Sequence, residues 1–173
     1  VISSYNFQHP ELSVNSLLSL LPMMESWEAP AFFKSRKKAE LQQLITDCMG
    51  LWTAVYTENE SYAINDTIHA TLQMIARNFA GVQVHILPTG LFSGDTTIQL
   101  TTQELISQRI IFQGIKKTTQ PYWLEKEHTK GLFHVTNTSL IGQPWNDAAA
   151  NVQAEITVNG SVFQITIPAQ YKL

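Results

Sequence analysis

The five histidines and the single cysteine are the side chains best suited to hold a metal or to attack a substrate. His69 and His85 fall on the outward faces of two alternating segments, and a pair on adjacent strands could bind zinc through imidazole nitrogens. Two exposed histidines that bind nothing are the interpretation we favour. The other three, His9, His128 and His134, lie in three different predicted segments. We expect no metal site and no cofactor in this chain.

The sequence also offers no activated nucleophile. Cys48 lies among apolar residues on a predicted helix face, and a buried thiol of this kind is unreactive. No G-x-S-x-G turn occurs. Glu125 and Glu127 stand close to His128 in a predicted loop, which is typical of solvated charge rather than of an acid–base pair. We therefore expect that the chain by itself is not an enzyme.

Large aromatic side chains remain as candidates for binding. Tyr122, Trp123 and Trp145 could stack on sugar rings where they are exposed, and they are the candidate ligand-binding residues. Trp145 stands in the turn 142–147, where exposure is expected. For Tyr122 and Trp123 we favour a structural role, in which the pair closes one end of the domain or docks on a neighbouring domain.

Composition restricts the partners further. The 173 residues carry a net charge of −3 and only three arginines, so the clustered basic face that nucleic acid requires is missing. Charged residues make up 14% instead of the usual ~25%, so uncharged polar residues must cover much of the surface, as in many secreted sandwiches. We find no signal peptide and no apolar run long enough to span a membrane. Because the chain begins at Val1, we expect a processed product or an excised piece of a longer protein.

Residues 1–50 are predicted to form a hairpin or connector of two short α-helices. Ser13 is a plausible cap for the first helix, whose apolar residues recur at helical spacing: Val14, Leu17, Leu18 and Leu21. The second helix is expected over residues 35–49, with Gly50 ending it and an apolar face formed by Leu41, Leu44, Ile45 and Cys48. The basic cluster 34–38 is unusual at its start, because helix N-termini favour acidic residues.

From residue 51 the apolar period changes from 3.6 to 2, which indicates half-buried antiparallel strands. The alternation is clearest over residues 68–74, 82–86 and 152–158. Asn159-Gly160 is a strong signal for a type I′ hairpin turn. The return strand then supplies an inward face of Phe163, Ile165 and Ile167.

The number of strands favours a two-layer β-domain. Further strands are expected near residues 51–57, 96–101, 108–115 and 132–136, which brings the count to about eight. The less regular stretch 116–131 is expected to cross between two sheets. The chain is thus predicted to be mainly β, with an immunoglobulin-like antiparallel β-sandwich over residues 51–173 preceded by the helical segment 1–50.

Five short motifs give the chain a resemblance to a known family. They are Gln120-Pro121-Tyr122-Trp123-Leu124, Gly131-Leu132-Phe133-His134-Val135, Leu140-Ile141-Gly142-Gln143-Pro144, and the two terminal runs 154–160 and 167–172. Their order resembles the C-terminal β-sandwich region of long, multidomain members of the PIG-L/LmbE (GlcNAc-PI de-N-acetylase-like) deacetylase family. A looser likeness covers the helix from about Lys37 to Gly50-Leu51-Trp52.

The resemblance implies an accessory role. Members of that family carry a zinc-dependent, amide-hydrolysing domain at the N-terminus, marked by A-H-P-D-D and a later H-x-x-H. Here His9-Pro10 is followed by Glu11-Leu12, and no H-x-x-H occurs, so no zinc ligand carries over. The implied partner is the catalytic domain of the same polypeptide, which would hold the zinc. The parent protein would deacetylate N-acetyl sugars or glycoconjugates outside the cytoplasm, in the periplasm or after secretion.

A carbohydrate-binding β-sandwich module is the alternative, with a glycan as partner. It requires a row of exposed aromatic residues along one sheet or loop edge. An accessory domain instead requires an apolar or aromatic patch that another domain covers.

Overall fold

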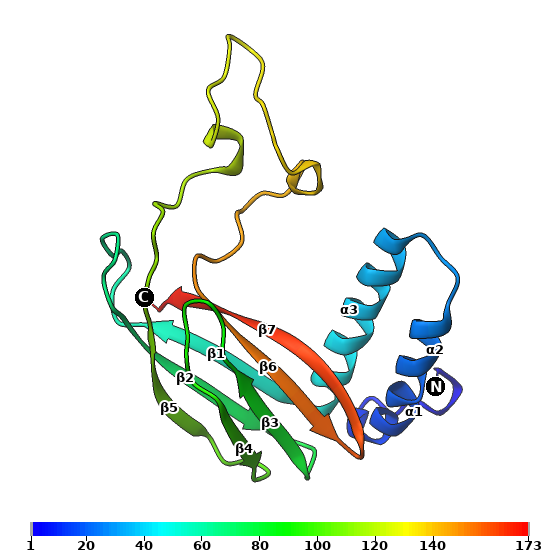
Figure 1. Cartoon of the computed structure of the whole chain (residues 1–173). Helices are drawn as coiled ribbons and strands as arrows, with labels where there is room; N and C mark the ends of the chain where they lie inside the picture. The colour runs from blue at the N-terminus through cyan, green and yellow to red at the C-terminus, as the bar shows by residue number, and fades with distance from the viewer. Residues whose placement is uncertain (1, 173) are drawn as a thin grey trace.

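The computed structural model describes residues 2–172, and it confirms that the chain is mainly β. Seven strands form one hydrogen-bonded sheet in the order β4-β3-β6-β7-β1-β2-β5 (Figure 1). The strands are β1 (Leu51–Thr57), β2 (Ile68–Ala76), β3 (Val82–Leu87), β4 (Thr96–Leu100), β5 (Ile106–Phe112), β6 (Asn151–Val158) and β7 (Ser161–Tyr171).

The sheet is nearly closed and barrel-like. β7 pairs antiparallel with β6 over most of its length, and its last residues then pair parallel with β1, so one strand joins the two halves. Beyond the end of β4, Thr102 forms a bridge with Ala76 at the end of β2. The prediction of a two-sheet immunoglobulin-like sandwich is therefore not confirmed, because β7 holds both halves in one continuous sheet.

The interior follows the predicted alternation. Val82, Val84 and Ile86 of β3 are buried while the residues between them are more exposed, and β2 and β6 repeat this pattern. Each fully buried aliphatic or aromatic side chain of this kind contributes about 1.5–3 kcal/mol to stability. The predicted hairpin at Asn159-Gly160 is confirmed, since both residues have positive φ, 47° and 76°, as a type I′ turn requires.

The β3–β4 connection packs against the end of β5, in the space between the two edge strands β4 and β5. Phe92 is 7% exposed and packs against Phe112, with ring centroids 6.0 Å apart. The amide of Phe92 donates to the hydroxyl of Thr89, and the amide of Gln113 donates to the carbonyl of Leu91, over 2.8 Å. Phe92 thus covers Phe112 and ties the β3–β4 connection to the end of β5.

The helical segment packs at one side of the sheet (Figure 1). It comprises two short 3₁₀ turns (Ile2–Ser4 and Pro10–Ser13) and the helices α1 (Val14–Leu18), α2 (Leu20–Ser26) and α3 (Ala31–Met49). The predicted apolar faces are largely confirmed, because Val14, Leu17, Leu18, Ile45 and Cys48 are buried in the main core cluster. Leu44 is an exception at 48% exposure, and α3 begins at Ala31, earlier than expected.

Gly50 ends α3 as predicted. Its φ of 63° lies in the left-handed region that favours glycine, and its amide donates to the carbonyl of Asp47. The chain then enters β1 at Leu51. The helix end is therefore joined directly to the central part of the sheet.

The basic cluster 34–38 is balanced by acidic residues that surround it. Lys38 forms an ion pair with Glu25 of α2, and two further cations of the cluster pair with Glu40 one turn along α3. The hydrogen bond and charge of Lys38 lower the pKa of the Glu25 carboxyl below its ordinary value. These contacts explain how a basic helix start is tolerated, although each exposed pair contributes little by itself.

Candidate interaction site

The segment 113–150 leaves the sheet after β5 and returns to it at β6, and we call it the arm. Figure 1 shows it projecting well beyond the strands, with two short 3₁₀ turns, η3 (Tyr122–Leu124) and η4 (Thr138–Leu140). The stretch 116–131 was predicted to cross between two sheets, but it forms the outgoing half of this arm. The strand predicted at 132–136 is wrong. Only an isolated bridge between Thr129 and Leu132 forms there, because no other strand lies beside it.

Asn146 joins the outgoing and the returning halves of the arm, at a distance from the sheet. Its side-chain oxygen Oδ1 accepts a hydrogen bond from the amide of Tyr122 over 3.0 Å, and its Nδ2 donates to the carbonyl of Gln120. The hydroxyl of Tyr122 donates a longer bond, 3.5 Å, to the carbonyl of Gln143. We call these four residues, Gln120, Tyr122, Gln143 and Asn146, the clasp. The clasp holds together chain segments that are more than twenty residues apart.

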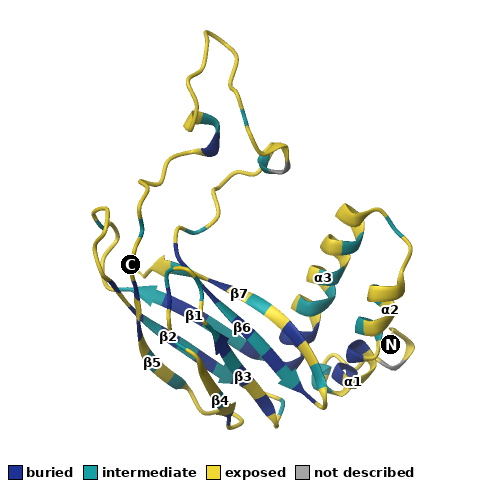
Figure 2. Cartoon of the chain, viewed as in Figure 1, coloured by how far each residue is buried: buried dark blue, intermediate teal, exposed yellow. Residues whose placement is uncertain are grey.

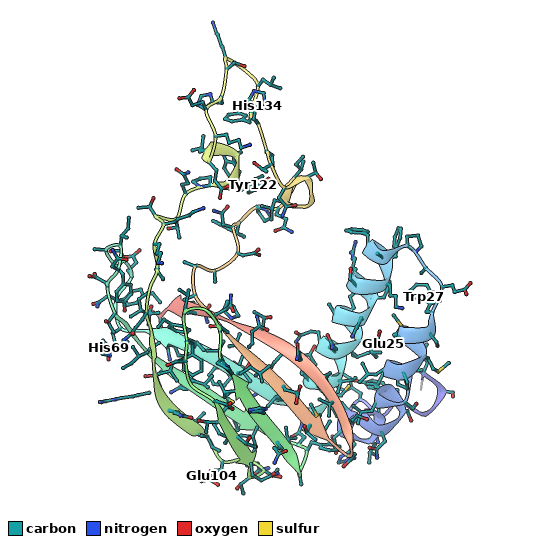
Figure 3. All side chains as sticks on the ribbon, viewed as in Figure 1. Glu25, Trp27, His69, Glu104, Tyr122 and His134 are labelled. Carbon is teal, nitrogen blue, oxygen red and sulfur yellow. The ribbon has the colours of Figure 1, made fainter. Side chains whose placement is uncertain are left out.

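The structure places all three predicted binding residues on the arm. Tyr122 is buried at the clasp and is labelled in Figure 3. Trp123 packs edge-on against it, with ring centroids 4.9 Å apart and planes at 88°. Trp145 is 80% exposed. Tyr122 and Trp123 are thus brought together, and Trp145 reaches the surface next to Asn146.

Asn146 itself was missed by the sequence analysis. The only feature in the sequence that could have indicated it is its place in the predicted turn 142–147, directly after Trp145. Asn side chains in turns often bond to nearby backbone groups. The backbone groups that Asn146 binds are distant in sequence, however, and a sequence pattern does not reveal them.

The arm exposes large apolar side chains along its length, and Figure 2 shows it almost entirely as exposed surface. These residues are Leu124, Leu132, Phe133, Ile141 and Trp145, with exposed fractions between 42% and 80%. Single exposed apolar residues are ordinary, but five on one projecting segment mark a surface that a partner can cover.

A cleft of about 500 Å³ opens at the base of the arm. The outgoing segment lines one side with Lys116 and Lys117, and the returning segment contributes Asp147. Leu91 from the β3–β4 connection forms part of its wall. Tyr122 and Asn146 of the clasp also line the cleft, which therefore lies between the clasp and the β3–β4 connection.

The candidate groups for chemistry do not converge. His69 lies on β2 and His85 on β3, which are not neighbours in the sheet, so the pair proposed for zinc does not meet. His85 instead contacts Asp95 over 2.6 Å. Within residues 2–172, no three histidine, cysteine or acidic side chains are grouped to hold a metal.

The remaining nucleophile is inaccessible. Cys48 is 5% exposed, as predicted, and burial raises the pKa of its thiol, with the Asp47 charge adding to the effect. The reactive thiolate is therefore disfavoured. Among the helices that the structure describes, none has the length and hydropathy needed to cross a membrane.

No protein-family model matches the chain, and no curated protein matches it. The arm and its clasp are consequently the features on which a functional proposal can be built.

Proposed function

We propose that this chain is a non-catalytic accessory domain that docks through its arm. The partner is the zinc-dependent catalytic domain of the same polypeptide, a PIG-L/LmbE-type enzyme that deacetylates N-acetyl sugars outside the cytoplasm. One observation carries the proposal: a projecting segment exposes five large apolar side chains that nothing in the described chain covers. Burying such residues against another domain is favourable by about 25 cal/mol per Å².

The position of the family-like motifs supports the same proposal. The motifs 120–124, 131–135 and 140–144 all lie in the arm. The first and third of them supply Gln120, Tyr122 and Gln143 to the clasp. Four of the five exposed apolar residues and three of the four clasp residues therefore belong to the motifs of the resemblance, whereas Trp145 and Asn146 lie just outside them.

The test begins with the gene that encodes the chain. We expect an A-H-P-D-D motif followed by H-x-x-H in frame upstream of the codon for Val1. That upstream segment, expressed separately, should then bind the present chain in isothermal titration. A start codon or secretion signal directly before Val1, or a catalytic segment that gives no heat with the chain, would refute the proposal.

A glycan-binding module remains the second candidate because Trp145 is 80% exposed and could stack on a sugar ring. The other two aromatic residues favour it less. Tyr122 is buried, and its ring stands nearly perpendicular to that of Trp123, so the pair presents no flat platform. Titration with chitin oligomers and a panel of polysaccharides separates the two candidates: heat that is lost in Trp145→Ser supports the module, and no heat with any glycan excludes it.

A further inference from the structure

We propose that Asn146 is the positioning residue for docking: it closes residues 120–146 into one pre-organised unit, which we call the lobe, and so fixes the apolar surface before the partner arrives. This inference rests on the proposed function and adds a specific device to it. The lobe lies between two connecting segments, 113–119 and 147–150, and contains all five of the large exposed apolar residues of the arm.

The first argument is the reach of the Asn146 side chain. It bonds to Tyr122 and Gln120, which precede it by 24 and 26 residues. Without these bonds only the long hydrogen bond from the Tyr122 hydroxyl to the Gln143 carbonyl would join the two ends of the lobe among the described residues, and bringing the ends of a long loop together costs conformational entropy. The hydrogen bonds of the clasp offset this entropy loss in the free domain, before any partner binds. A partner that binds the closed lobe therefore does not have to order it, which raises affinity.

The second argument is what the clasp holds next to it. Trp145 directly precedes Asn146, and Trp123 directly follows Tyr122, against which it packs. Fixing the backbone at Tyr122 and Asn146 therefore fixes the starting points of both tryptophans. Leu124 follows in the same 3₁₀ turn, where its amide bonds to the carbonyl of Pro121 over 2.8 Å.

The third argument is the contrast with the connecting segments. The base of the arm is anchored to the body by hydrogen bonds at Gln113, Ile115 and Ala150. Between these anchors and the clasp, residues 116–119 and 147–149 form no hydrogen bond within the part of the chain that is described. The clasp is thus the element that orders the lobe, because the segments below it carry no such bonds.

Two variants of Asn146 remove bonds of the clasp, and a third variant serves as the control. Asn146→Ala removes both side-chain bonds. Asn146→Asp keeps an oxygen that can accept from the Tyr122 amide but cannot donate to the Gln120 carbonyl. Asn15→Ala is the matched control, because it removes an asparagine side-chain bond outside the arm, in which Nδ2 of Asn159 donates to Oδ1 of Asn15 over 2.7 Å.

Amide hydrogen exchange of the isolated domain, followed by NMR, tests the clasp directly. The amide of Tyr122 should exchange slowly in the wild type and in Asn15→Ala, and at least about tenfold faster in Asn146→Ala, while the amides of β2 and β6 keep their rates. Asn146→Asp should lie between these limits. A Tyr122 amide that already exchanges freely in the wild type, or equally in all four proteins, would overturn the proposal.

Binding to the upstream catalytic segment then tests positioning. Asn146→Ala should bind about tenfold more weakly through a less favourable entropy, because the partner must now order the lobe. Asn15→Ala should bind like the wild type. Equal affinity of Asn146→Ala and wild type would refute the positioning role even if exchange had shown the clasp. If the wild type does not bind at all, the proposed function fails, and the exchange result shows separately whether the clasp exists.

Discussion

Replacing Trp145 by serine should leave folding almost intact and weaken docking strongly. Trp145 is 80% exposed, so only about one-fifth of the ~250 Å² that a tryptophan can bury is removed from water in the free domain. At about 25 cal/mol per Å², the loss in free energy of unfolding is about 1.25 kcal/mol. For a domain of this size that corresponds to a fall in melting temperature of about 2–4 °C.

The same arithmetic gives a large effect on binding. If the partner covers the exposed four-fifths, about 200 Å² is buried, which sets a ceiling near 5 kcal/mol. Central aromatic residues of interfaces typically realise about 2–4 kcal/mol of such a ceiling, which weakens binding about 30- to 700-fold when they are removed. Differential scanning calorimetry and isothermal titration with the upstream catalytic segment measure the two quantities on the same samples.

Leu105→Ser is the matched control for Trp145→Ser. Leu105 is 52% exposed in the turn between β4 and β5, beside Glu104, which Figure 3 shows at the opposite end of the sheet from the arm. It should change neither melting nor binding appreciably. Equal binding by the two variants would refute the role of the arm, and a melting temperature lowered by more than about 10 °C in Trp145→Ser would show that the residue belongs to the core.

Three further predictions concern the body of the domain. Phe92→Ala should destabilise the domain by about 3–5 kcal/mol because it removes the buried ring that packs against Phe112. A loss of less than about 1 kcal/mol in the free energy of unfolding, measured by urea denaturation, would contradict that packing. Because Lys38 lowers the pKa of Glu25, their contact stabilises the fold above the ordinary carboxyl pKa and is lost as pH falls through the lowered value; melting temperatures between about pH 6 and pH 3 should therefore depend less on pH in Glu25→Gln, and identical profiles would exclude the contact. The Cys48 thiol should react with a disulfide reagent only after guanidinium unfolds the chain, and rapid reaction of the native protein would show that it is not buried.

Much of the sheet could be predicted because burial on one face leaves a period of two in the sequence. This period predicts β2, β3 and β6, and the residue types Asn159-Gly160 predict the turn that follows β6. The closure of the sheet was not predictable in this way. It depends on the parallel contact between β1 and β7, which are more than a hundred residues apart and carry no local signal for each other.

In the arm, the sequence predicted a strand that does not form. Residues 132–136 contain residue types that are common in strands, such as Phe133, Val135 and Thr136, yet a strand also needs a neighbour for its hydrogen bonds, and the arm offers only the isolated bridge at Leu132. The clasp was missed for a related reason, since Asn146 meets Tyr122 across 24 residues. Tyr122 itself was identified as a candidate from its residue type, whereas its burial at the clasp depends on the fold.

The most direct test of the account places a photo-activated cross-linker in the intact polypeptide. Replacing Trp145 by p-benzoylphenylalanine, irradiating the protein and mapping the cross-linked peptides by mass spectrometry identifies what covers the arm. We predict a link within the same polypeptide between position 145 and the domain that carries A-H-P-D-D. Links only to residues of the present chain, or none at all in a correctly folded protein, would contradict docking through the arm.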